Sequence, residues 1–147
     1  MLVTVFVQNE AGSKQKNYHN EKTLQYLVTK SVSRPYPYPY GFIVGTTASD
    51  GYNLDCFVIT DQPLKTGQTV ECEVIGLMEQ IEDGVEDHNV LAAPVGKTAP
   101  INPEVERILT EFVMNVFAHI VGKQMHVGRF RDAVQAKAYV LAHCDAR

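Results

Sequence analysis

The sequence predicts a mainly β fold with α-helices (α+β), in which helices pack on a small β-barrel. Two observations predict this class. The first two thirds of the chain alternate short apolar runs with turn residues, which is typical of five or six strands, and the last third changes to the helical period. With 147 residues and 45% hydrophobic content, residues 1–147 are expected to form one globular domain with its own core.

Six segments are predicted to be strands. Residues 2–7 form a β-branched run, and residues 69–80 alternate valine and cysteine with glutamate, as a half-buried strand does. The other four are shorter and are bounded by turn residues: residues 23–30, 41–46, 56–60 and 89–94. Residues 60–68 contain Pro and Gly and are predicted to be a connection.

Two helices are predicted in the last third of the chain. Asn102 can cap the first helix, with Pro103 at its first position. Apolar residues at helical spacing continue from Val105 to Val121, and Gly122 is the expected C-terminal stop. The second helix is predicted to start at Asp132 and to run to residue 144.

The composition excludes several classes of function. A net charge of -4 and a pI near 5.7 do not suit a nucleic-acid binder, which needs clustered Lys and Arg. No segment approaches the ~20 apolar residues of a membrane span, and the first ten residues lack the pattern of a signal peptide. Three widely spaced cysteines, Cys56, Cys72 and Cys144, do not form a disulfide framework and favour a reducing compartment. A cytoplasmic protein is therefore expected.

Two acidic turns are the candidate functional site. Asp50 and Asp55 bracket the turn SDGYNLD, and a second turn holds four acids: Glu82, Asp83, Glu86 and Asp87. Such turns are either solvated loops or ligands for a hard cation such as Mg²⁺, which favours carboxylates. Two carboxylates about 4 Å apart repel by about 4 kcal/mol at an effective dielectric of about 20. Converging acids would therefore need a cation, raised pKa values or room to spread apart.

Four stretches, in this order, carry a resemblance to a known family: GSKQK (12–16), YPYPYGFI (36–43), DGYNLDCFVIT (50–60) and PLKTGQTVECEVIGLMEQIEDGVEDHNVLAAP (63–94). The chain resembles the soluble inorganic pyrophosphatases. The resemblance implies a small five-stranded, OB-like closed barrel with two C-terminal helices. It also implies hydrolysis of diphosphate to two phosphates with Mg²⁺, or Mn²⁺, as cofactor, and self-association as a dimer or hexamer.

The resemblance also assigns residues. The metal ligands that it implies are Asp50, Asp55, Asp87 and Glu82, and the substrate-binding residues are Lys16, Lys30, Tyr36 and Tyr40. Lys30 would stand near a family arginine, whose bidentate fork an ammonium lacks. Of this set, Asp50, Asp55 and Asp87 correspond to the family's tightest metal site.

The chain departs from the family pattern at several positions. Tyr52 stands where the family has the aspartate proposed to be the catalytic base, and a tyrosine side chain keeps its proton at pH 7. Family residues are also replaced at four other positions: Tyr18 stands for a glutamate, Asn89 for a lysine, and Val116 and Phe117 for a Tyr-Lys pair that grips phosphate. The last two fit the apolar stripe of the predicted helix. Glu10 and His88 are candidates to repair the site, although His88 is more often expected as an exposed loop residue.

Three functional hypotheses follow from this mixture. The first is a divergent Mg²⁺-dependent phosphoric-anhydride hydrolase acting on diphosphate. The second is a degenerate homologue with little or no catalysis, which binds metal or phosphate or serves as a partner subunit. In this hypothesis Tyr52 and Asn89 are the substitutions mainly responsible for the loss of activity. The third is hydrolysis of another phosphorylated molecule, with Tyr18 and Tyr52 offering aromatic faces to an organic group. Fold resemblance alone does not choose among them.

Overall fold

The computed structural model describes residues 1–98 and 100–146. In this part the chain forms, in order, β1 (Leu2–Asn9), β2 (Gln15–His19), β3 (Tyr26–Ser31), β4 (Tyr40–Ile43), β5 (Asp55–Val58), β6 (Thr69–Glu82), β7 (Val85–Glu86), β8 (Asn89–Pro94), α1 (Pro103–Asn115), β9 (Met125–Arg131) and α2 (Ala133–Ala142). The six strands predicted from the sequence correspond to β1, β3, β4, β5, β6 and β8.

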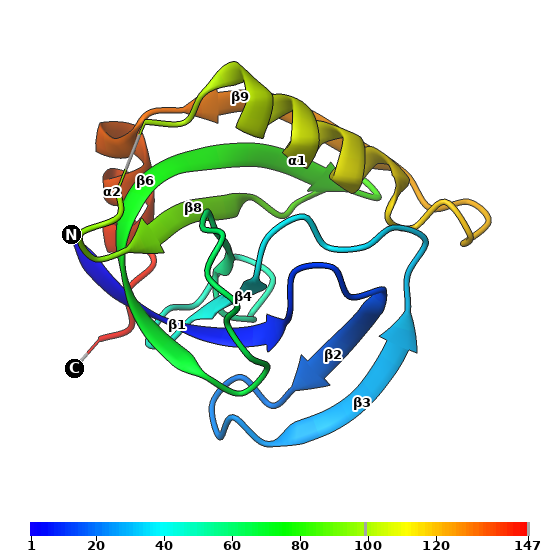
Figure 1. The fold of residues 1–147 in the computed structure, drawn as a ribbon, viewed down its shortest axis with the longest axis horizontal. Helices are drawn as coiled ribbons and strands as arrows, with labels where there is room; N and C mark the ends of the chain where they lie inside the picture. Colours follow the sequence, from blue (N-terminus) through cyan, green and yellow to red (C-terminus); the bar gives the residue numbers. More distant parts are fainter. Residues whose placement is uncertain (99, 147) are drawn as a thin grey trace.

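Five of the strands close into a barrel, as predicted. Hydrogen-bonded neighbours follow the order β1, β4, β5, β8 and β6, and β6 pairs back onto β1. The long β6 makes this closure, because its first residues pair with β1 while its middle pairs with β8. Figure 1 shows β6 as a curved green ribbon along one side of the molecule. Only the β5–β8 pair is parallel among these contacts.

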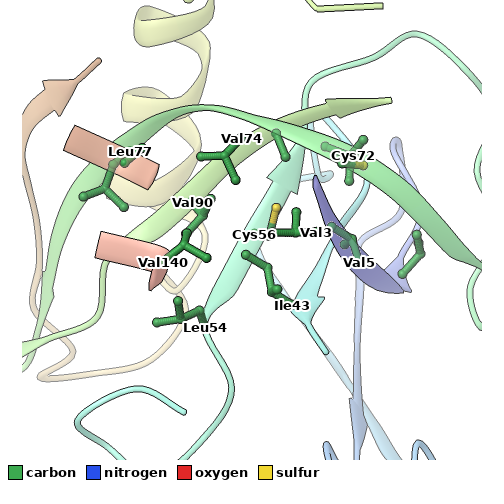
Figure 2. Close-up of a cluster of buried hydrophobic side chains, with 14 of the residues drawn as sticks. Val3, Val5, Ile43, Leu54, Cys56, Cys72, Val74, Leu77, Val90 and Val140 are labelled. Atoms are coloured by element: carbon green, nitrogen blue, oxygen red, sulfur yellow. The ribbon is translucent and has the colours of Figure 1, made fainter. Parts of the chain in front are cut away.

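Apolar side chains fill the barrel. Figure 2 shows Val5, Cys56, Val74 and Val90, from four different strands, gathered between the ribbons, with Val140 of α2 beside them. The alternation predicted for β6 is confirmed in its first half, since Cys72 and Val74 are buried and the glutamates between them are not. Burial of this kind stabilises a domain by roughly 1.5–3 kcal/mol for each large apolar side chain.

Three strands were not predicted. The two-stranded sheet of β2 and β3 stands beside the barrel, and β9 pairs with the second half of β6. β2 has the polar sequence QKNYH, and β9, MHVGRFR, is largely exposed or half-buried. The short β7 pairs with the end of β6. Neither β2 nor β9 shows the alternation of apolar and polar residues by which a strand is recognised in a sequence. Both form strands through hydrogen bonding to a neighbouring strand, which a sequence pattern does not reveal.

The first helix begins as predicted but ends earlier. The side chain of Asn102 accepts a hydrogen bond from the backbone N–H of Val105 at 2.9 Å, which confirms the cap. The helix ends at Asn115 rather than near Gly122, so the predicted end was wrong. Ser33 is the physical reason: its N–H donates to the carbonyl of Val116 at 2.9 Å, and its hydroxyl accepts the N–H of His119 at 3.1 Å. These bonds hold residues 116–122 in turns.

The second helix confirms its prediction. Asp132 caps α2 by accepting the N–H of Gln135 at 2.9 Å, and α2 packs against β6 and β8 while α1 packs against β9. Both buried residues of α2, Ala136 and Val140, belong to the barrel core. In the described residues, neither helix has the length and apolar character needed to cross a membrane.

Gly41 provides a test of the barrel packing. A Cβ at this position would lie 1.8 Å from the carbonyl oxygen of Phe6, so Gly41→Ala must push β1 away from β4. We expect this substitution to lower the free energy of unfolding by roughly 1–3 kcal/mol or more, measured by urea denaturation. Val44→Ala, in the exposed residue just after β4, is the matched control and should change stability by less than about 0.5 kcal/mol. Equal effects of the two substitutions would contradict the close approach.

Candidate functional site

Predicted site residues meet at a small cavity between the barrel and α1. The cavity has a volume of about 40 Å³, enough for a few water molecules. It is lined by Lys16, Tyr36, Tyr40, Phe57, Gln80, Glu82, Asp87, Asn89, Phe112, Val113, Val116, Phe117 and Met125. A larger cavity of about 730 Å³ lies between β6, β9 and the start of α2, but it holds none of the predicted site residues. The smaller cavity is therefore the candidate site.

Lys16 is the basic residue of this cavity, and aromatic rings surround it. Its ammonium nitrogen lies 5.4 Å from the ring centre of Tyr18, 5.2 Å from that of Tyr40 and 5.7 Å from that of Phe117. Burial alone would lower the pKa of Lys16, but Tyr36 and Asp55, with smaller effects from Tyr18 and Asp87, raise it above its ordinary value. The ammonium therefore stays charged, and it is available to bind an anion.

Asp55 and Asp87, which belong to the two separate acidic turns, come together in the structure. Asp55 starts β5 and pairs with Asn89 at the start of the parallel strand β8, so Asp87 comes within hydrogen-bond reach. Burial, followed by the charge of Asp87, raises the pKa of Asp55 well above its usual value, although Lys16 opposes this shift. Two adjacent carboxyl groups of this kind suit a divalent cation, which would relieve their repulsion.

Asp50 and Tyr52 lie in the exposed turn before β5. The Asp50 carboxylate accepts the backbone N–H of Tyr52 at 3.0 Å, and the Tyr52 side chain is 65% exposed. Neither residue lines the cavity. Asp50 is nevertheless close enough to Tyr139 of α2 to act on its pKa, which burial, Glu86, Asp87, Asp50 and Asp55 raise to about 12. The two acidic turns thus both face Tyr139.

Metal binding by three carboxylates stays a prediction. Over residues 1–98 and 100–146, no group of three or more Asp, Glu, His or Cys side chains is arranged to hold a metal ion. Glu82, the fourth predicted ligand, lines the cavity and forms an ion pair with Lys123 at 3.5 Å. The structure therefore brings Asp55 and Asp87 together, places Glu82 at the cavity wall, and leaves Asp50 in solvent.

The predicted substrate-binding residues lie on neighbouring elements. Tyr36 and Tyr40 are buried with ring centres 5.4 Å apart, and burial raises the pKa of both hydroxyls. Lys30 of β3 pairs across the sheet with Lys16 of β2. Its exposed ammonium lies 5.4 Å from the Tyr18 ring, the ring that Lys16 also approaches. The structure thus places both lysines around one aromatic side chain.

The substituted family positions are occupied by neutral, packed side chains. Asn89 is buried and donates to the side-chain oxygen of Gln80 at 2.6 Å. Val116 is buried among the residues of α1, which agrees with the core role expected for it, and Phe117 is half-buried beside it. Both border the cavity, so their apolar groups fill space next to Lys16.

Neither Glu10 nor His88, the two residues that could have replaced lost site residues, lines the cavity. Glu10 instead accepts the N–H of Thr66 at 3.2 Å. His88 is not an exposed loop residue, because only 9% of its side chain is accessible. The N–H of Gln80 donates to its Nδ1 at 3.0 Å, and Nε2 lies 3.5 Å from Glu86. Both ring nitrogens of His88 therefore already have protein partners.

Sequence reasoning missed three further charged groups near the site. Glu21 accepts the N–H of Asn53 at 2.8 Å, and Lys22 donates to the Asn53 side chain at 2.9 Å. Burial raises the pKa of Glu21, an effect that the Asn53 hydrogen bond opposes. The third group is Lys123, which contacts Glu82. No spacing in the sequence indicates these contacts, because they join segments about 30 to 40 residues apart in the chain.

The chain is similar in sequence and in fold to known proteins of one family. The sequence matches the family model described as inorganic pyrophosphatase over residues 5–145. An inorganic pyrophosphatase from Nanoarchaeum equitans is 35% identical over 135 residues, covering 88% of this chain and 84% of that protein. Another from Synechocystis sp. is 40% identical over 96 residues, covering 63% of this chain and only 56% of the relative's length. The inorganic pyrophosphatase structure from Thermus thermophilus has a TM-score of 0.89 and 25% identity, covering 97% of this chain and 88% of that one.

Asp55→Asn tests the repulsion between the two carboxyl groups. Because the folded-state pKa of Asp55 is raised, its ionised form opposes folding, and wild-type stability rises as pH falls through that pKa toward the unfolded value. At pH 8 without divalent cations, the variant should be more stable by about 1 kcal/mol or more, since one pKa unit corresponds to about 1.4 kcal/mol. Urea denaturation at several pH values should show this gain shrinking toward pH ~4.

The matched control is Asp61→Asn, which changes an exposed aspartate outside the cavity. It should alter stability by less than about 0.5 kcal/mol at every pH. A loss of stability in Asp55→Asn at pH 8 would show that the ionised carboxylate is favourable in the folded chain, contrary to the repulsion inferred here.

Proposed function

Because the chain belongs to the inorganic pyrophosphatase family, we propose that it hydrolyses inorganic diphosphate to two phosphates with a divalent cation, Mg²⁺ or Mn²⁺. The proposal is supported above all by the cluster of Lys16 and Asp87, which line the cavity, and Asp55, which lies next to Asp87 outside the cavity lining. The cluster joins a pair of acids to a half-buried ammonium group. Diphosphate hydrolysis needs both features, since charge must be neutralised on the phosphates and a water must be activated.

Asp55 and Asp87 are the residues proposed to hold the divalent cation. Asp50, from the adjoining turn, is proposed as their third partner, and Glu82 as the acid on the cavity wall. When bound, such a cation supplies charge neutralisation and lowers the pKa of a bound water. The raised pKa of Asp55 supports this assignment, because adjacent carboxyl groups without a cation retain a proton between them.

Lys16, Lys30 and the tyrosines are the residues proposed to hold diphosphate. The Lys16 ammonium would neutralise phosphate oxygens from within the cavity, and Lys30 would do so from the exposed side of Tyr18. Tyr36 and Tyr40 carry protonated hydroxyls, because burial raises the pKa of each. Of these two, Tyr40 has its ring against Lys16, so its hydroxyl is the one proposed to donate to a phosphate oxygen.

One observation favours a second candidate, a homologue that binds phosphate or metal but turns over slowly. The cavity of about 40 Å³ is small because Val116 and Phe117 occupy its wall, and Tyr52 cannot replace a carboxylate base. Activity on a different phosphorylated molecule is the third outcome, and a screen of nucleotides and sugar phosphates distinguishes it.

Phosphate release from diphosphate is the direct test. Wild-type protein with Mg²⁺ or Mn²⁺ should release phosphate above the buffer rate, and Asp87→Asn should lower the rate about 100-fold or more, since it removes a proposed metal ligand. Asp61→Asn is the control and should retain the wild-type rate. Release no faster than in buffer, across several pH values and both metals, would leave only the binding or alternative-substrate functions.

Tyr52→Asp tests whether the missing carboxylate limits the rate. Tyr52 is exposed, so the substitution costs little packing and should raise kcat about tenfold or more by restoring a base. Asn89→Lys is a poor restoration, because Asn89 is buried and hydrogen-bonded to Gln80, and it should lower thermal stability instead. An unchanged kcat in Tyr52→Asp would show that the missing carboxylate at position 52 does not limit the rate.

A further inference from the structure

We propose that Lys123, in the loop between α1 and β9, is a further diphosphate-binding lysine besides Lys16 and Lys30, and that it takes over from the charges absent at positions 89 and 117. This inference rests on the proposed function. It concerns a residue outside the four stretches that carry the family resemblance, and it follows from where β9 places the end of the loop.

The structure holds Lys123 beside the acidic turn. The N–H of Asp83 donates to the carbonyl of Gln124 at 2.8 Å, and the N–H of Gln124 donates to the Asp83 carboxylate at 2.8 Å. Next to this pair, Glu82 of β6 is in register with Met125 of β9. In Figure 1 the loop that follows α1 extends beyond the end of β6 before it returns as β9. Lys123 is thus held in place by the two residues that follow it in the chain.

The ammonium group of Lys123 contacts the wall of the candidate site. It lies 3.5 Å from Glu82 and 3.4 Å from Asp83, and 5.1 Å from the ring centre of Phe117. Only 22% of its side chain is exposed. Glu82 and Phe117 both line the cavity, so Lys123 contacts two of the cavity-lining side chains.

Phe117 links this lysine to Lys16. The two ammonium groups both lie within 5.7 Å of the centre of the same ring. Cations take such positions because the face of an aromatic ring attracts positive charge. The replacement of a charged side chain by Phe117 has therefore left a surface that holds two lysines close to one cavity.

The cavity-lining side chains carry too little positive charge to neutralise a bound diphosphate. Among the described lining residues, Lys16 is the only basic side chain, while Glu82 and Asp87 are acidic. A diphosphate carries several negative charges that must be neutralised on binding. The carboxylates of Glu82 and Asp83 hold the Lys123 ammonium in place, and phosphate oxygens, which are equally good acceptors, compete with them for it. Lys30 approaches Tyr18, which is not a cavity-lining residue, whereas Lys123 contacts two side chains that line the cavity and can supply the missing charge there.

The test measures binding of methylenediphosphonate, a diphosphate analogue that cannot be hydrolysed, by calorimetry in the presence of Mg²⁺. Lys123→Gln should weaken binding about tenfold, the loss of one charge-assisted hydrogen bond, and Lys123→Arg should restore most of the affinity. Lys65→Gln, which removes a lysine from an exposed loop distant from the cavity in sequence, is the matched control and should bind as the wild type does.

A purely structural role for Lys123 predicts something different. Asp83→Asn keeps an oxygen for the Gln124 N–H but removes one of the two charges that compete for Lys123. If Lys123 binds diphosphate, Asp83→Asn should tighten binding by about twofold or more while Lys123→Gln weakens it. If the lysine only holds the loop, both substitutions break the same ion pair and should change affinity and melting temperature in the same direction.

The outcomes separate this inference from the function on which it rests. Opposite shifts of affinity in the two variants support Lys123 as a diphosphate ligand. Wild-type protein that releases phosphate and binds the analogue, with Lys123→Gln binding equally well, would overturn the inference and leave the proposed function standing. Wild-type protein that neither binds the analogue nor releases phosphate would overturn both.

Discussion

The repulsion between two neighbouring carboxyl groups is the constraint on which the site depends. Asp55 and Asp87 meet because β5 and β8 are parallel neighbours, and burial, followed by the charge of Asp87, raises the pKa of Asp55. Such an arrangement persists only where the surrounding structure holds it, because each side chain would be more stable in water. The closed ring of β1, β4, β5, β8 and β6 provides this rigidity. Lys16 provides the opposing charge.

Around these two carboxyl groups, aromatic and neutral side chains stand at positions where the family resemblance implies charged ones. Lys16 lies among the rings of Tyr18, Tyr40 and Phe117, and Asn89 makes a neutral hydrogen bond to Gln80. The aromatic faces keep lysines positively charged without supplying charge of their own. The cavity keeps Glu82, Asp87 and Lys16, and the other lysines near it are Lys30, by Tyr18, and Lys123, by Phe117.

Much of the fold could be predicted because its signals are local. The strands β1, β5 and β8 are short apolar runs, and the caps Asn102 and Asp132 stand where the helices begin. The errors concern segments whose state is decided by a distant partner. β9 forms because β6 extends past the barrel, and α1 ends early because Ser33 bonds to the residues that follow it. Neither partner is visible in a window of local periodicity.

The same division applies to the site. The sequence by itself determined the order of strands and helices, the two acidic turns, and the identities of Asp55, Asp87 and Lys16 as charged groups on or beside strands. Only the tertiary structure decided that Asp55 and Asp87 adjoin, that Asp50 lies in solvent, and that Glu21, His88 and Lys123 surround the acidic turns. The physical reason is that residue type and spacing govern backbone conformation over a few residues, whereas contacts between charges depend on strand register and barrel closure, which bring together residues far apart in the chain.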